Sequence, residues 1–230
     1  EILIGLVGSE MCIRDRFCNK DELADIFAEG KYCIFTKGNR YIYGVGNFFI
    51  NLVDDNNKAV LPLVMLDSNM YGDGGWFYSG FDCIHKDQTE WCMNKLTSLK
   101  NEDENIKAMA FFHMPVREFK EAYERMKLGD NDVIYKHGSV GEKNDHFGIS
   151  RFKGIFFNSA VDNGVIKWMF CGHDHLNTLS LVYKGIQLTY GMSIDYLGYK
   201  GIEKQYTQRG GTLICLLYTS PSPRDRSVSR

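Results

Sequence analysis

The stretch Cys171-Gly172-His173-Asp174-His175 decides how the rest of the chain is interpreted. It follows an apolar run, Val165 to Cys171, that is broken only by Lys167, a composition typical of a buried strand. A strand that ends in this way places both imidazoles at the carboxyl edge of a sheet, where open α/β folds bind their ligands. Neutral imidazole is the commonest side-chain metal ligand, but a single His-x-His pair is as readily a surface or hydrogen-bonded pair.

A second apolar run ends in the same way. Ala108-Met109-Ala110-Phe111-Phe112 leads into His113-Met114-Pro115, and Pro115 stops the strand because it has no N–H and restricts the residue before it. Two strands that each deliver histidine at their ends can assemble a metal site from distant parts of a chain. We therefore expect His113, His173 and His175 to converge at one rim of a sheet.

These motifs resemble the last two motifs of the calcineurin-like metallophosphoesterases, and the flanking sequence is similar to the branch related to purple acid phosphatases. The stretches that carry the resemblance are Gly44-Val45-Gly46-Asn47, Leu66-Asp67-Ser68, Asp87-Gln88 with Trp91, and Tyr190-Gly191. The resemblance runs from about Phe17 to Ile214. It implies a layered α/β/β/α sandwich, incomplete here because the N-terminal half of the site has no counterpart in the chain.

The resemblance also implies two divalent or trivalent metal ions, of iron, zinc or manganese, which activate water and clamp a phosphoryl group. His113 and His173 would bind one ion and His175 the other. Asp174 and Asn177 would support the turn by hydrogen bonds, although a plain turn role for Asp174 is equally open. Asp67 would lie near the site without binding metal. The family's acid/base histidine would lie upstream, so no catalytic residue is assigned within this chain.

We expect the full-length parent to be a phosphomonoesterase that acts on a phosphate-ester small molecule or a phosphoprotein, and this polypeptide alone to be inactive. A phosphodiesterase or nuclease uses the same metal core, but a net charge of −2 gives no electrostatic argument for nucleic acid. A non-catalytic pseudoenzyme that keeps the fold as a binding module is the third alternative. The metallo-β-lactamase signature continues as His-x-Asp-His, whereas Leu176 follows His175, so that fold is discounted.

Composition fits at most one ordinary domain. The 230 residues are 44% hydrophobic and 13% aromatic, which is enough for a core. No run approaches the ~20 apolar residues of a membrane span. The seven cysteines lack the spacing of a disulfide framework or a zinc ribbon, and most are expected to be buried small hydrophobes.

The two ends, 1–16 and 215–230, are interpreted as translated sequencing adapter, which leaves 17–214 as the native portion. Codons can be chosen so that the DNA for Glu1 to Asp15 is the reverse complement of that for Cys215 to Arg230 over nearly its whole length. Two unrelated protein ends would hardly permit this. A disordered tail rich in Ser, Pro and Arg is the alternative for 218–230.

Periodicity and turn residues predict the remaining elements. Helices are expected at 21–28, 87–99, 116–126 and 149–160, with Asp87 and Glu90 forming a capping box. Strands are expected at 32–35, 41–43, 47–53, 58–66, 179–183 and 186–190, and another begins at 212–214.

Two loops are candidates for a functional role. The stretch 128–146 is predicted to be irregular and is long enough to be functional. Its His137 or His146 could touch a substrate phosphate, although solvated loop histidines are commoner. The run Gly72-Asp73-Gly74-Gly75 imitates a metal motif of the family but occurs out of order, so we interpret it as a decoy within a loop that shapes the substrate entrance.

Overall fold

The computed structural model describes residues 19–71, 80–196, 202–204 and 209–216. The interpretations of 1–16, of 217–230 and of Gly72-Asp73-Gly74-Gly75 therefore concern residues outside these ranges. The described helices are α2 (Lys20–Ala28), α3 (Lys86–Glu102), α4 (Glu118–Lys127), α5 (Phe156–Asn163) and the short 3-10 helix η2 (Ile202–Lys204). The described strands are β1 (Phe48–Val53), β2 (Ala59–Met65), β3 (Ala108–Phe111), β4 (Val133–His137), β5 (Ile166–Cys171), β6 (Ser180–Tyr183) and β7 (Ile186–Tyr190).

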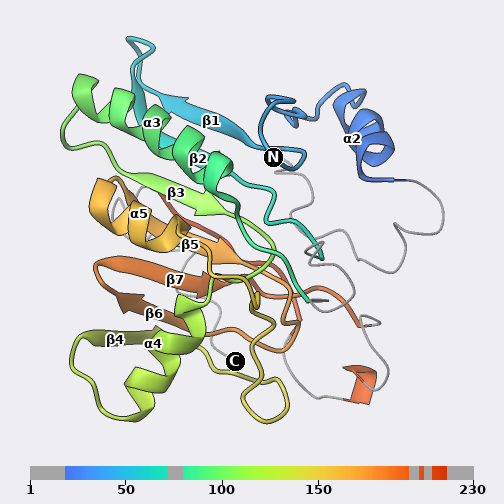
Figure 1. Ribbon diagram of the computed structural model, residues 1–230, viewed down its shortest axis with the longest axis vertical. Helices are drawn as coiled ribbons and strands as arrows, with labels where there is room; N and C mark the ends of the chain where they lie inside the picture. Colours follow the sequence, from blue (N-terminus) through green and yellow to red (C-terminus); the bar gives the residue numbers. More distant parts are fainter. Residues whose placement is uncertain (1–18, 72–79, 197–201, 205–208, 217–230) are drawn as a thin grey trace, which may run out of the picture.

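The strands form one seven-stranded sheet in the order β1-β2-β3-β5-β7-β6-β4 (Figure 1). The four central strands, β2, β3, β5 and β7, run parallel, whereas β1, β6 and β4 pair antiparallel with their neighbours. Parallel strands end at a common edge, so the segments after these four strands meet there. The predicted hairpins, β1 with β2 and β6 with β7, are confirmed, and so is the α/β fold class.

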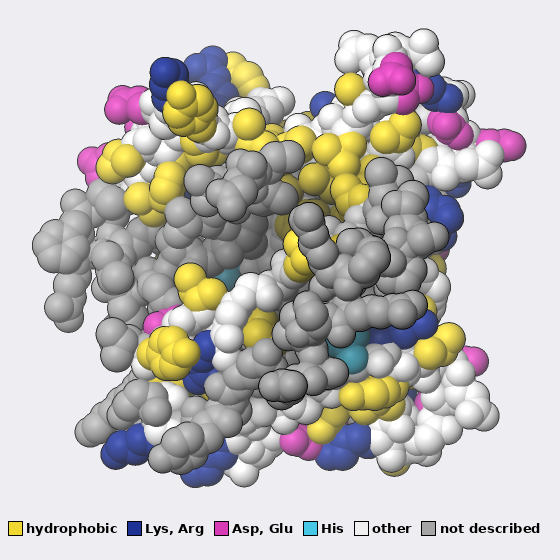
Figure 2. Space-filling view, turned by 180° about the vertical axis from the view of Figure 1, so that it is seen from behind, with side chains coloured by type: hydrophobic (Ala, Val, Ile, Leu, Met, Phe, Trp, Pro, Cys, Tyr) yellow, Lys and Arg dark blue, Asp and Glu magenta, His cyan; other side chains and the backbone are white. Residues whose placement is uncertain are grey.

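Helices α3, α4 and α5 cover one face of the sheet (Figure 1). Alternation along the strands separates the two faces, because successive side chains point to opposite sides. On β3, Ala108 and Ala110 join the large core under the helices, whereas Met109 belongs to a smaller apolar cluster on the other side. Figure 2 looks onto that second side and shows hydrophobic side chains gathered over its upper part. The described residues thus supply one sheet and one helical layer of the predicted sandwich.

Two predicted N-terminal strands and one predicted cap are wrong. Residues 32–35 and 41–43 form no strand, and two of their tyrosines are solvated, with Tyr32 81% and Tyr41 79% exposed. These residues have a β-like composition but no neighbouring strand to pair with, and strand propensity takes effect only when a segment packs against a neighbouring strand. The Asp87 carboxylate accepts a hydrogen bond from the Tyr43 N–H at 2.7 Å. Helix α3 begins after His85 instead, whose N–H donates to the Gln88 side chain at 2.8 Å.

The second half of the chain holds three further corrections. The stretch 128–146 is not wholly irregular, because β4 lies within it and pairs with β6. Helix α5 begins at Phe156 rather than at 149, since the Ser150 hydroxyl accepts from the Phe152 N–H and donates to the Phe81 carbonyl. These contacts turn the chain before the helix can start. Residues 212–214 form no strand. No helix in the described part is both long and apolar enough to cross a bilayer.

Truncating the α3 core side chain tests this packing. Leu96 is fully buried between the helices and the sheet, so Leu96→Ala is expected to lower the free energy of unfolding by about 2–5 kcal/mol, measured by urea titration. Ser98→Ala on the exposed side of the same helix serves as the control and should change it by less than about 0.5 kcal/mol. Equal losses for the two variants would contradict the assignment of the buried face.

Candidate metal centre

Three histidines line one open pocket at the carboxyl edge of the sheet. His113 follows β3, while His173 and His175 follow β5, and residues 191–195 after β7 also line the pocket. The pocket has a volume of about 450 Å³, within the range of roughly 300–1,000 Å³ that small-molecule sites occupy. The structure therefore brings together the three histidines that the sequence singled out, although their role as metal ligands stays a prediction.

Two of the imidazoles are spaced as ligands of one ion would be. The Nε2 atom of His113 lies 3.4 Å from the Nδ1 atom of His173, and the two rings are nearly perpendicular at 81°. Two nitrogens bound at ~2.0–2.1 Å to one tetrahedral ion would lie roughly 3.4 Å apart. Within the described ranges, no group of three His, Cys, Asp or Glu side chains is arranged to hold an ion. The residues present thus fit a metal as part of its coordination shell.

His173 occupies an unusual backbone conformation. Its φ of 71° lies in the left-handed region, which residues other than glycine rarely adopt and which concentrates at functional sites. Burial, together with the nearby His175 and His146, lowers the pKa of His173 to about 4. The imidazole is therefore neutral near pH 7, which is the form that binds metal. The ring of Phe81 packs edge-on against the His173 imidazole, with 4.5 Å between the ring centroids.

Gly148 shapes this arrangement, and no sequence motif singles it out. A Cβ atom on Gly148 would lie well inside 3.0 Å of the His173 ring, a separation that real Cβ atoms do not show. The Gly148 N–H also donates to both carboxylate oxygens of Asp174, at 3.0 and 3.1 Å. The glycine thus makes room for one predicted site residue and fastens another.

Gly148→Ala is expected to displace the His173 ring and to lower the free energy of unfolding by about 1–3 kcal/mol, because the added methyl overpacks a filled space. Urea titration measures the second effect, and the nitrogen-15 resonances of the His173 imidazole report the first. Gly154→Ala is the matched control, since its Cβ would meet its nearest neighbours at 3.7 Å, an ordinary contact. An unmoved His173 resonance in Gly148→Ala would contradict the steric argument.

Asp174 and Asn177 fasten the histidine turn to the segment 138–148. Buried Asp174 accepts from the Tyr190 hydroxyl at 2.6 Å, in addition to the Gly148 N–H. The fully buried Asn177 accepts from the N–H groups of Gly141 and Glu142, and its amide donates to the His146 carbonyl. Burial raises the pKa of Asp174, and the hydrogen bond from Tyr190 acts against that rise. The hydrogen bonds of both residues thus hold the turn.

Removing the Tyr190 hydroxyl tests this clamp. Tyr190→Phe is expected to lower the free energy of unfolding by about 1.5–3 kcal/mol near pH 7, because a buried carboxylate loses a donor. The loss should shrink as the pH falls through the pKa of Asp174, since the protonated carboxyl needs the donor less. Tyr135→Phe removes an exposed hydroxyl that donates to the Gly138 carbonyl, and it should cost less than about 0.5 kcal/mol. A pH-independent loss in Tyr190→Phe would rule out the carboxylate as the cause.

Comparison with known proteins points in the same direction. No family model matches the chain. The chain is 29% identical over 172 residues to "Probable inactive purple acid phosphatase 29" of Arabidopsis thaliana, an alignment that covers 69% of this chain and 41% of that protein. It is 24% identical over 181 residues to "Probable inactive purple acid phosphatase 28" and 23% identical over 150 residues to "Probable inactive purple acid phosphatase 14" of the same plant, covering 71% and 62% of this chain.

These similarities to purple acid phosphatase-like proteins support a related phosphoesterase family. It spans 41%, 40% and 35% of the length of these three relatives. The printed names of all three describe those proteins as probably inactive. The relationship therefore supports a phosphoesterase ancestry and leaves open whether the site turns over substrate.

Two residues of the Leu66-Asp67-Ser68 motif make long-range contacts near the start of the sequence and at the turn after β3. The Asp67 carboxylate pairs with Lys20, the first residue of α2, and accepts from the Val45 N–H at 2.7 Å, so it joins the helix to the loop that holds Val45. The buried Ser68 hydroxyl accepts from the N–H groups of His113 and Met114, at 3.1 and 2.7 Å. Ser68 therefore fixes the backbone that carries His113, a role that the sequence did not indicate.

The two loop histidines separate in the structure. His137 ends β4 and lines a different pocket, on the sheet face away from the helices. His146 is near enough to His173 to influence its charge, and its carbonyl accepts from Asn177. Of the two, the structure places only His146 beside the pocket of the three histidines.

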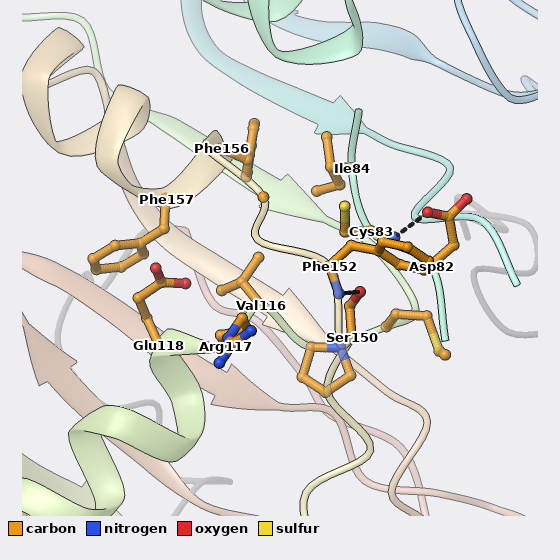
Figure 3. Close-up of a pocket in the computed structure, with 13 residues that line it drawn as sticks. Asp82, Cys83, Ile84, Val116, Arg117, Glu118, Ser150, Phe152, Phe156 and Phe157 are labelled. Carbon is orange, nitrogen blue, oxygen red and sulfur yellow. Dashed lines mark hydrogen bonds between the residues drawn. The ribbon is translucent and has the colours of Figure 1, made fainter. Parts of the chain in front are cut away.

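A second cavity lies beneath the helical layer, between the segments 82–84, 114–118 and 150–157 (Figure 3). Figure 3 shows Cys83 and Ile84 on one side of it and Phe156 and Phe157 on the other. Its volume of about 20 Å³ is on the order of the space that one water molecule needs. It is too small for a phosphate ester and therefore does not compete with the open pocket of the three histidines as a substrate site.

Proposed function

We propose that the protein to which this chain belongs is a dinuclear metal-dependent phosphoesterase whose substrates are phosphomonoesters, on small molecules or on phosphoproteins. The observation that carries the proposal is the 3.4 Å separation of His113 Nε2 and His173 Nδ1 in an open pocket at the carboxyl edge of the sheet. The relationship to purple acid phosphatase-like proteins gives the pair its chemical context. The proposal does not extend to nucleic acid, since the net charge of −2 offers no attraction to it.

In this proposal, His113 and His173 hold one ion and His175 holds the second. Iron, zinc or manganese at these positions would acidify a water molecule and offset the negative charge on the phosphoryl oxygens. The other residues of the chain act on the ligands rather than on the substrate. Asp174 and Asn177 keep the turn rigid, Ser68 fixes the His113 backbone, and Gly148 leaves space for the His173 ring.

We further propose that this polypeptide by itself does not hydrolyse phosphate esters. In the proposed arrangement its three histidines are divided between two metal positions, and an ion with one or two protein ligands is held weakly. Support comes from the described ranges, where no third acidic, histidine or cysteine ligand joins the pair.

A non-catalytic phosphate-binding or metal-binding module is the second candidate. The observation that favours it is the word "inactive" in the printed names of all three curated relatives. A pseudoenzyme would keep the sheet, the pocket and the fastened turn while lacking turnover. The two candidates share the fold and differ in whether the bound phosphate ester is cleaved.

The test is hydrolysis of p-nitrophenyl phosphate with added Mn²⁺, Zn²⁺ or Fe³⁺, by the 230-residue chain and by the product of the complete open reading frame that contains 17–214. The complete protein is expected to be active, and His113→Ala or His173→Ala should lower kcat/KM at least about 100-fold, because several kcal/mol of charge stabilisation are lost. His137→Ala, outside the pocket, is the matched control and should have little effect.

The possible outcomes separate the candidates. A complete protein that binds metal and phosphate without turnover favours the pseudoenzyme. Full activity of His113→Ala would exclude the proposed metal site. Metal-dependent hydrolysis by the 230-residue chain, abolished by His113→Ala, would refute its proposed inactivity.

A further inference from the structure

A carboxylate from a separate segment faces the third histidine of the pocket. The Oδ2 atom of Asp195 lies 3.2 Å from the Nδ1 atom of His175. Both side chains are largely buried, with 16% of His175 and 24% of Asp195 exposed. Such a partly enclosed pair keeps its geometry better than a solvated surface ion pair, which contributes little to stability and has mobile side chains.

Hydrogen bonds hold the segment that carries Asp195, both within the segment and to residues 209–212. The Asp195 N–H donates to the Ser193 hydroxyl at 3.1 Å, and the Asp195 carbonyl accepts from Arg209 Nε at 2.8 Å. The Met192 N–H donates to the Thr212 hydroxyl at 2.9 Å, so the segments 192–195 and 209–212 are joined to each other. These hydrogen bonds hold the segment that brings Asp195 to His175, and residues 191–195 line the same pocket as the histidine turn.

We infer that Asp195 is a positioning residue: its carboxylate, 3.2 Å from Nδ1 of His175, favours the tautomer with the proton on Nδ1 and so leaves Nε2 as the nitrogen that binds an ion in the pocket. An imidazole nitrogen can bind metal only without its proton, and the partner of the other ring nitrogen decides which one is bare. This pairing differs from that of His173, which turns its Nδ1 toward His113. The inference rests on the proposed metal site and adds to it the residue that orients its third ligand.

The protonation pattern of the metal-free chain gives a direct test that needs no activity. At about pH 9, above the ordinary imidazole range, nitrogen-15 spectra of the 230-residue chain should show His175 with its proton on Nδ1 and a bare Nε2. Zinc titrated into the same sample should shift the Nε2 resonance while the Nδ1 proton remains. Because this reading uses the unaltered chain, it does not depend on whether a variant folds.

A variant pair adds the energetic test. Asp195→Asn should weaken zinc binding, measured by calorimetry, by about 10–100-fold, the usual effect of losing a partner that orients a ligand. Asp132→Asn, at an exposed aspartate on the loop before β4, is the matched control and should bind zinc as the unaltered chain does. Asp195→Glu, which restores a carboxylate, should recover part of the lost affinity.

Three results would each overturn the inference: a proton on Nε2 in the metal-free chain, His175 resonances that zinc leaves unmoved, or equal zinc affinities for Asp195→Asn and Asp132→Asn. Failure of the proposed function looks different. A complete protein that binds zinc through His175 but does not cleave p-nitrophenyl phosphate would refute the phosphatase proposal and leave the role of Asp195 standing.

Discussion

The pairing of β3 with β5 is the constraint on which the site depends. Met109 lies opposite Trp168 and Phe111 opposite Phe170 in a parallel register, after an irregularity at Ala108. The ladder continues beyond the strands, because the Gly172 N–H donates to the His113 carbonyl at 3.1 Å. The two histidine-bearing turns are thus tied by a backbone hydrogen bond, which helps bring their imidazoles together. A slip of one residue would exchange the faces of β3 and turn His113 away from His173.

Buried polar side chains hold the two turns beyond β3 and β5 in place through hydrogen bonds. Ser68 holds the turn after β3, while Asp174 and Asn177 hold the turn after β5 against the segment 138–148. Such hydrogen bonds contribute modestly to stability when made, and leaving one partner buried and unpaired costs more. The arrangement therefore favours a single geometry for the turns over a set of alternatives.

The sequence predicted the parts of the fold that depend on strong local periodicity. Apolar runs, two tight hairpins and the histidines at strand ends were enough to place the central sheet and the edge at which the three histidines meet. It failed where tertiary contacts override composition: Tyr32 and Tyr41 have strand-like neighbours but no partner strand, and Asp87 is taken up by Tyr43 rather than by its helix. Gly148 and Asp195 could not be found either, because their roles come from residues far along the chain.

The left-handed backbone conformation at His173 limits which residues can occupy that position, whether or not the site is catalytic. Glycine, asparagine, aspartate and histidine accept that conformation, whereas β-branched and bulky side chains resist it. A lineage released from selection for catalysis would therefore not drift freely at this position. It would be channelled toward a few small or polar replacements, so a gene that had lost its activity could still carry the imprint of the turn.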